Sequence, residues 1–117
     1  MITVNVSIDR DKRECSLTVK GHAGQADIGK DIICASASIL AFTAAQVLKI
    51  MDEEGGEFSQ HPTLDLQNGD TAVSCCADDD TTFLQVAQTF FTIAMGYKLL
   101  AHNYPQYVEV TYSDGEA

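Results

Sequence analysis

The sequence has 117 residues, 45% of them hydrophobic, which suits a single globular domain spanning residues 1–117 and is too short for two. Seventeen acidic against seven basic residues give a net charge of -10, which disfavours direct nucleic-acid binding and favours a basic protein partner, although surplus acid also simply promotes solubility. No signal peptide and no apolar run of about 18 residues is found, so we expect a cytoplasmic protein without a membrane partner. The four cysteines form no CxxC pair and should be thiols there.

Two amphipathic strands are predicted at the start of the chain. Residues 2–9, ITVNVSID, and residues 15–20, CSLTVK, alternate apolar and polar side chains on either side of a charged turn. This pattern predicts an antiparallel hairpin. After a loop that contains glycines, the apolar spacing becomes helical from Asp31 and continues until Gly55 and Gly56 stop it.

A second hairpin is predicted for residues 64–74, LDLQNGDTAVS. Its Asn68-Gly69 pair suits a two-residue type I′ turn, because both central positions of that turn need a positive φ. A turn of this length places Leu66 opposite Thr71 on one face of the hairpin.

The last part of the chain combines a helix and a strand. Residues 78–102 have helical spacing and an acidic start, Asn103 and Pro105 end them, and residues 106–113 alternate again. The resulting ββαββαβ order predicts an α+β domain, with an antiparallel or mixed sheet packed against two long helices. Both helices are apolar on nearly every side, which suggests a second buried side and hence a homodimer.

The segment that joins the first hairpin to the first helix brings together a histidine and a cysteine. If Asp31 is the N-cap, Cys34 lies in the first helical turn, where the helix dipole favours the thiolate. His22 directly follows the second strand, and the loop is long enough to bring it beside the helix start. The pair could act as nucleophile and general base, although as a bare pattern it also suits a buried, inert cysteine.

Residues 21–38 resemble the signature of the Prp family, bacterial cysteine peptidases that process a ribosomal protein. That signature is GHAG, a short spacer and then G-x-D-I-V-C-A-A-V-S. It is matched at Gly21, His22, Ala23, Gly24, Gly29, Asp31, Ile32, Cys34, Ala35 and Ser38. Length, acidic balance, hairpins and helices are similar too, so the resemblance covers the whole chain. The departures are Gln25 and Ile28, where aromatic residues are expected, and more mildly Ile33 and Ser36.

The resemblance implies a homodimeric cysteine endopeptidase without a cofactor. Cys34 would be the nucleophile, and His22 the general base and then the general acid. The implied substrate is the large-subunit ribosomal protein L-twenty-seven, whose N-terminal extension is removed by cleavage after a phenylalanine. Ribosomal proteins are strongly basic, so a net charge of -10 would steer such a substrate toward the enzyme.

Further residues of this segment have candidate supporting roles. Asp31 could orient His22, although an N-cap role is the simpler explanation. Ser38, one turn after Cys34, could donate a hydrogen bond to the sulfur or to its own helix. A predicted substrate loop, which is either a closing lid or a set of turns, comprises Gly21, Ala23, Gly24, Gln25, Ile28 and Gly29.

Two other classes of function stay open. A metal site at His22 and Cys34 would need further ligands, and no pair of ligands has the spacing of a zinc site. A non-catalytic module could instead bind a ribosomal protein, or assist ribosome assembly, through the same groove. Of the remaining candidates, we expect His61 at the surface and Cys15 and Cys75 in the core.

Overall fold

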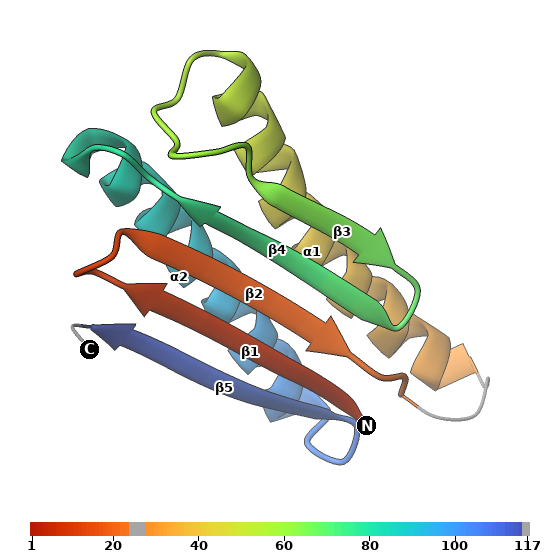
Figure 1. Cartoon of the computed structure of the whole chain (residues 1–117). Helices are drawn as coiled ribbons and strands as arrows, with labels where there is room; N and C mark the ends of the chain where they lie inside the picture. The colour runs from red at the N-terminus through yellow and green to blue at the C-terminus, as the bar shows by residue number, and fades with distance from the viewer. Residues whose placement is uncertain (24–27, 116–117) are drawn as a thin grey trace.

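The chain folds into seven elements, and the computed structural model describes residues 1–23 and 28–115, with residues 28–31 described by their backbone alone. The sheet is mixed, since all of its neighbouring strands are antiparallel except one parallel pair at an edge. The elements are β1 (Ile2–Asp9), β2 (Glu14–Lys20), α1 (Ile28–Glu53), β3 (Thr63–Gln67), β4 (Asp70–Cys76), α2 (Asp80–Asn103) and β5 (Val108–Gly115). The strand order is β3-β4-β2-β1-β5, and the parallel pair is β1 with β5 (Figure 1).

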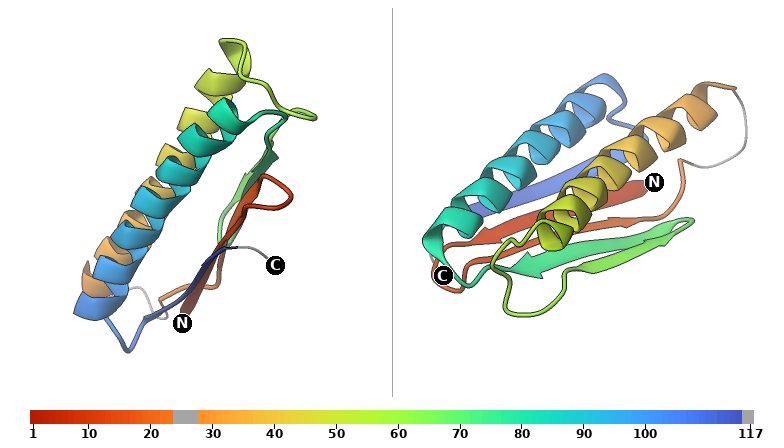
Figure 2. Two further views of the ribbon diagram at one scale, coloured as in Figure 1. Left: turned by 90° about the vertical axis from the view of Figure 1, so that its left-hand side faces the viewer. Right: turned by 90° about the horizontal axis from the view of Figure 1, so that it is seen from above.

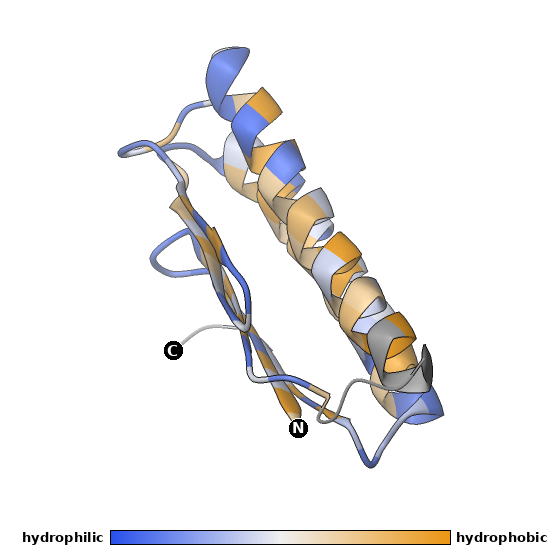
Figure 3. Ribbon diagram, turned by 90° about the vertical axis from the view of Figure 1, so that its right-hand side faces the viewer, coloured by the Kyte–Doolittle hydropathy of each residue, from blue (hydrophilic) through white to orange (hydrophobic). Residues whose placement is uncertain are grey.

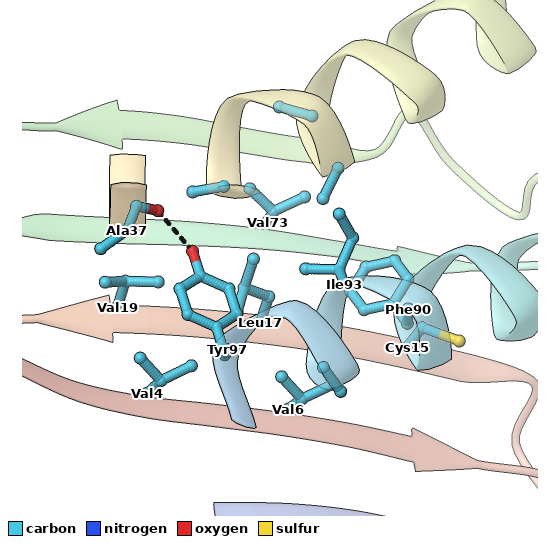
Figure 4. Close-up of a cluster of buried hydrophobic side chains, with 14 of the residues drawn as sticks. Val4, Val6, Cys15, Leu17, Val19, Ala37, Val73, Phe90, Ile93 and Tyr97 are labelled. Atoms are coloured by element: carbon cyan, nitrogen blue, oxygen red, sulfur yellow. Dashed lines mark hydrogen bonds between the residues drawn. The ribbon is translucent and has the colours of Figure 1, made fainter. Parts of the chain in front are cut away.

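Both helices lie on one face of the sheet, and the other face is open (Figure 2). The alternating strands turn their apolar side chains toward the helices, because successive residues of a strand point to opposite faces. Tyr97 of α2 is fully buried in this core, and its hydroxyl donates a 2.7 Å hydrogen bond to the Ala37 carbonyl of α1 (Figure 4). The largest fully buried side chains are Tyr97, Phe90, Leu17, Ile33, Leu48, Val4, Val6, Val73, Val86 and Cys15.

The predicted α+β class and ββαββαβ order are confirmed. In the second hairpin Leu66 lies opposite Thr71, as the pattern indicated. The predicted stop of the first helix is also confirmed: Gly55 has a φ of 88°, and the Gly56 N–H donates to the Met51 carbonyl at 2.7 Å. A left-handed glycine followed by such a bond satisfies the last free carbonyls of a helix.

The predicted type I′ turn is wrong. Gly69 has a φ of 74°, but among the described residues Arg13 is the one non-glycine with a positive φ, so Asn68 does not have one. A negative φ followed by a positive one is the pattern of a type II turn. The Gly69 carbonyl accepts a 3.0 Å hydrogen bond from the Gly21 N–H, a tertiary contact that local hairpin preferences do not include.

The predicted start of the first helix is also wrong. The helix α1 begins at Ile28, three residues before Asp31, so Asp31 is not its N-cap. An aspartate is favoured both at the N-cap and within the first turn of a helix, so the sequence rule could not separate the two positions. The helix α2 shows the expected arrangement: its N-cap, Asp79, accepts from the Thr82 N–H at 2.7 Å, and this bond lowers the pKa of the Asp79 carboxyl.

Hydrophobic residues run along most of the helical layer (Figure 3). Residues 32–53 of α1 are long and apolar enough to cross a membrane by length and composition, a test that core helices of soluble proteins also pass. In this fold α1 packs beside α2 against the sheet. Among the described side chains of the two helices, seven large apolar ones stay exposed, namely Ile32, Ile39, Phe42, Ile50, Leu84, Phe91 and Leu99.

Candidate active site

A cavity of about 310 Å³ contains both Cys34 and His22. It lies between the N-terminal half of α1, the end of β2 and the turn that joins β3 to β4. Its wall is more apolar than polar. The lining residues are Ile2, Val19, Gly21, His22, Cys34, Ala37, Ser38, Ala41, Phe42, Leu66, Gln67, Asn68, Gly69 and Thr71.

Cys34 reaches this cavity from the second turn of α1. The helix begins at Ile28, so Cys34 is not in the first turn, and the predicted stabilisation of a thiolate by the helix terminus loses its basis. Ile33 before it and Ala37 one turn later are buried in the core, whereas Cys34 is only half-buried. The helix therefore holds the sulfur at the boundary between the core and the cavity.

His22 enters the same cavity from the end of β2. Its side chain is exposed, and its backbone is fixed on both sides. The Met1 nitrogen donates to the His22 carbonyl at 2.7 Å, and the preceding Gly21 N–H donates to the Gly69 carbonyl at 3.0 Å. The imidazole is thus an accessible base on a well-anchored piece of backbone.

The structure distributes the other predicted site residues differently. Ser38 and Gly21 line the cavity, but no hydrogen bond joins the Ser38 hydroxyl to Cys34 in the described part of the chain. Ala23 is buried in the core instead of facing substrate. Gly24 and Gln25 lie outside the described residues. Ile28, Gly29 and Asp31 belong to α1, and only their backbone is described, so the predicted loop ends earlier than expected.

One wall of the cavity was not predicted from the sequence. Leu66, Asn68 and Gly69 come from the β3–β4 hairpin, and Phe42 comes from the exposed side of α1. The hairpin reaches His22 because β4 pairs with β2 across the sheet. Sequence patterns identified each hairpin but not how the two hairpins pair with each other. The Asn68-Gly69 turn was visible in the sequence, but nothing there indicated that it would lie beside His22.

A second hollow of about 230 Å³ is lined by His61 and by three cysteines, of which Cys15 and Cys75 are buried and Cys76 is half-buried. It lies on the open face of the sheet, where Ser16 and Ser74 pair across β2 and β4. His61 Nδ1 lies within hydrogen-bond distance of the Asp52 carboxylate, at 2.7 Å, but 92% of the His61 side chain is exposed. The Cys76 thiol donates to the Lys12 carbonyl at 3.4 Å. The same sulfur accepts a hydrogen bond from the Ser59 hydroxyl at 3.4 Å, so neighbouring groups occupy it both as a donor and as an acceptor.

The remaining two cysteines are core residues, as predicted. Cys15 and Cys75 lie opposite each other on β2 and β4 and face the helices. Their mutual hydrogen bond and burial raise the pKa of the Cys15 thiol well above its ordinary range. The described residues contain no group of three or more His, Cys, Asp or Glu that could hold a metal ion.

The arrangement at the first cavity suits covalent catalysis. A half-buried thiol and an exposed imidazole share one cavity, and the imidazole can take the proton of the thiol as the sulfur attacks a carbonyl carbon. Apolar walls beside the thiol can receive a side chain of a bound peptide and exclude water from the reacting bond.

Comparisons with known proteins agree with this chemistry. The model of the family described as Cysteine protease Prp matches residues 1–109, whereas the comparison with curated protein sequences found no match. The solved structure of SMU.848 from Streptococcus mutans has a TM-score of 0.68 at 23% identity, with 98% of this chain and 96% of that chain covered. The essential ribosomal processing protease Prp from S. aureus, solved with a substrate peptide, gives 0.66 at 19% identity, with 96% and 99% covered. The same protease solved with a covalently linked product peptide gives the same values.

Proposed function

Since the chain belongs to the Prp family of cysteine proteases, we propose that it removes the N-terminal extension of the bacterial large-subunit ribosomal protein L-twenty-seven by cleavage after a phenylalanine. The observation that carries this proposal is the shared cavity of Cys34 and His22, with its apolar walls. The protease that S. aureus uses for ribosomal processing has the same fold and was solved with a substrate peptide, which supports the choice of substrate class.

The proposed reaction forms and breaks a thioester. His22 takes the proton from the Cys34 thiol while the sulfur attacks the scissile carbonyl carbon. The tetrahedral intermediate collapses, His22 gives the proton to the departing amine, and the extension stays bound to Cys34 as an acyl group. A water molecule then loses a proton to His22, attacks the thioester and releases the extension as a carboxylic acid, and the proton returns to the sulfur.

The negative charge on the intermediate needs hydrogen-bond donors besides Cys34 itself. Cys34 lies beyond the first turn of α1, so its own N–H is engaged with the preceding helical turn. The Gly21 N–H is engaged with the Gly69 carbonyl, so we expect the donors to come from other backbone outside the helix, on the side of the cavity that carries His22.

The apolar wall supports the preference for phenylalanine. Phe42 and Leu66 are 48% and 41% exposed in the free protein, and both line the cavity that contains Cys34. An aromatic side chain placed between them would remove apolar surface of both partners from water. An acidic side chain at the same position would lose its hydration without gaining a partner.

We also propose that the enzyme works as a cytoplasmic homodimer. The exposed apolar side chains of α1 and α2 lie on the helical layer, and large exposed apolar patches mark association surfaces. We propose that a second copy of the chain covers this surface, because the exposed apolar side chains of the two helices lie on the same layer of the molecule. Sedimentation analysis should show a dimer, and Ile39→Glu should shift it to the monomer.

The test of the function is a cleavage assay with mass spectrometry. The purified protein is mixed with L-twenty-seven that carries its extension, and the products are weighed. We expect two products whose masses place the cut after a phenylalanine, and none with the Cys34→Ala variant. An uncut substrate that nevertheless binds to the protein would contradict the proposal and support the non-catalytic binding module.

A further inference from the structure

The imidazole of His22 rests against the backbone of Gly69, at the tip of the β3–β4 hairpin. A Cβ atom added to Gly69 would lie 2.6 Å from Cε1 of His22 and closer still to Nε2. No real Cβ approaches a ring atom that closely, so the ring occupies the space that a side chain at this position would fill. The contact is made on the edge of the ring that carries Nε2.

The hairpin tip and the histidine are also held together through the backbone. The Gly21 N–H donates to the Gly69 carbonyl at 3.0 Å. One residue further on each strand, Lys20 and Asp70 are paired in the sheet, and their side chains form an ion pair at 3.6 Å. The turn therefore keeps a fixed position relative to the residue that precedes His22.

Hydrogen bonding does not explain the position of the ring. Among the described side chains, which do not include those of residues 24–31, no hydrogen bond or ion pair to the His22 imidazole is found. In many nucleophile–histidine pairs a carboxylate or amide fixes the ring. Here the part of the chain that the structure describes offers a surface of backbone atoms instead.

We propose that Gly69 is a positioning residue for catalysis, because its missing side chain creates the seat that directs the His22 imidazole toward Cys34. This inference rests on the proposed peptidase function. Gly69 lines the cavity but carries no reacting group, and in this scheme it acts through His22. A displaced ring would transfer a proton less efficiently, since small errors in the placement of a catalytic group lower the rate steeply.

A role in the turn alone is the competing explanation, because Gly69 has a φ of 74°. Two variants separate the two roles. Gly69→Asn keeps a residue type that tolerates a positive φ but adds the obstructing Cβ. Gly55→Ala is the matched control, because Gly55 has a φ of 88° and open space where its Cβ would be. It suffers the same backbone strain far from His22.

The experiment measures peptide cleavage and the His22 ring signals by NMR for the parent, Gly69→Ala, Gly69→Asn, Gly55→Ala and His22→Ala. We expect kcat to fall by about 10²-fold in Gly69→Ala and Gly69→Asn, with KM within about threefold and with shifted ring signals. Gly55→Ala should keep kcat within about twofold of the parent, even if its melting temperature falls as much as that of the Gly69 variants.

Several results would overturn the proposal. Folded Gly69 variants with the parent kcat, or with unshifted His22 ring signals, would show that the seat does not position the ring. If neither variant folds, the parent protein decides: nuclear Overhauser contacts between the Gly69 α-protons and the His22 ring are expected, and their absence refutes the seat. Failure of the peptidase function is recognised separately, since it would leave His22→Ala as active as the parent or the parent itself inactive.

Discussion

Two hollows in this small domain each bring a half-buried cysteine and a histidine together, and they differ in nearly everything else. In the first, Cys34 is held by a long helix at the edge of the core, and His22 rests on an anchored strand end. In the second, the Cys76 thiol donates to a backbone carbonyl, and the His61 side chain is almost entirely in water. Anchoring, access and apolar walls therefore identify the candidate site better than the residue types do.

The comparison is tested most strongly by removing each thiol in turn. Cys34→Ala should lower kcat by about four orders of magnitude or more, because no other group can form the acyl intermediate. The same change at Cys76 should leave kcat within about twofold. Steady-state cleavage assays measure both, and circular dichroism checks that each variant is folded. Equal losses in the two variants would remove the distinction between the hollows.

Removing each histidine should give the next largest effect. His22→Ala is expected to lower kcat by about 10²-fold to 10⁴-fold, the usual contribution of a general acid and base. His61→Ala should lose its ion pair with Asp52 and little else, because surface pairs of this kind stabilise a protein weakly. The readouts are kcat and the melting temperature. An unchanged kcat in His22→Ala would exclude His22 as the base.

Salt should have a smaller effect, and on binding only. The net charge of -10 is that of the whole chain, so its effect on binding does not distinguish the two hollows. The association rate of a basic substrate with Cys34→Ala should fall by about tenfold as the Debye length shrinks from about 30 Å to about 3 Å. The dissociation rate should change little. Stopped-flow fluorescence can measure both rates, and an association rate independent of salt would assign the charge to solubility alone.

The smallest predicted effect lies at the C-terminal end of β5, away from the site. Arg10 contacts both oxygens of Asp114 at 2.8 Å and 2.9 Å, and this contact lowers the pKa of the Asp114 carboxyl. A lowered folded-state pKa means that the pair stabilises the fold above the ordinary aspartate pKa and that this contribution is lost as pH falls through the folded value.

The variant Asp114→Asn tests this pair. Its melting temperature should be slightly lower than that of the parent near neutral pH, and the difference should shrink as the solution is acidified below about pH 4. Cleavage should be unaffected. A difference in melting temperature that grows on acidification would contradict the assigned direction of the pKa shift.

Local patterns predicted most of the fold, and tertiary contacts explain what they missed. Alternating apolar residues identified the strands, and the pairing of Leu66 with Thr71 followed from the length of the turn. The parallel pairing of β1 with β5 joins the two ends of the chain, which no local pattern contains. The predicted type of the Asn68-Gly69 turn was wrong for a related reason. The Gly69 carbonyl accepts a hydrogen bond from the Gly21 N–H, which follows a strand of the other hairpin.

The site was predicted in part for the same reasons. Cys34 and His22 were found because they lie close together in the sequence and match a family signature. The walls of the cavity come from the second hairpin and from the exposed side of α1, whose positions depend on the sheet order. The predicted effect of the helix dipole on Cys34 was wrong because α1 starts at Ile28, three residues before the predicted N-cap Asp31.

The central claim, that Cys34 attacks the scissile carbonyl, is tested most directly by trapping the intermediate. The parent enzyme is mixed with extended substrate, quenched with acid during turnover and weighed, and the modified peptide is located by tandem mass spectrometry. We expect an adduct with the mass of the cleaved extension on Cys34, attached as a thioester that hydroxylamine removes. An adduct on Cys76, or continued cleavage by Cys34→Ala, would contradict it.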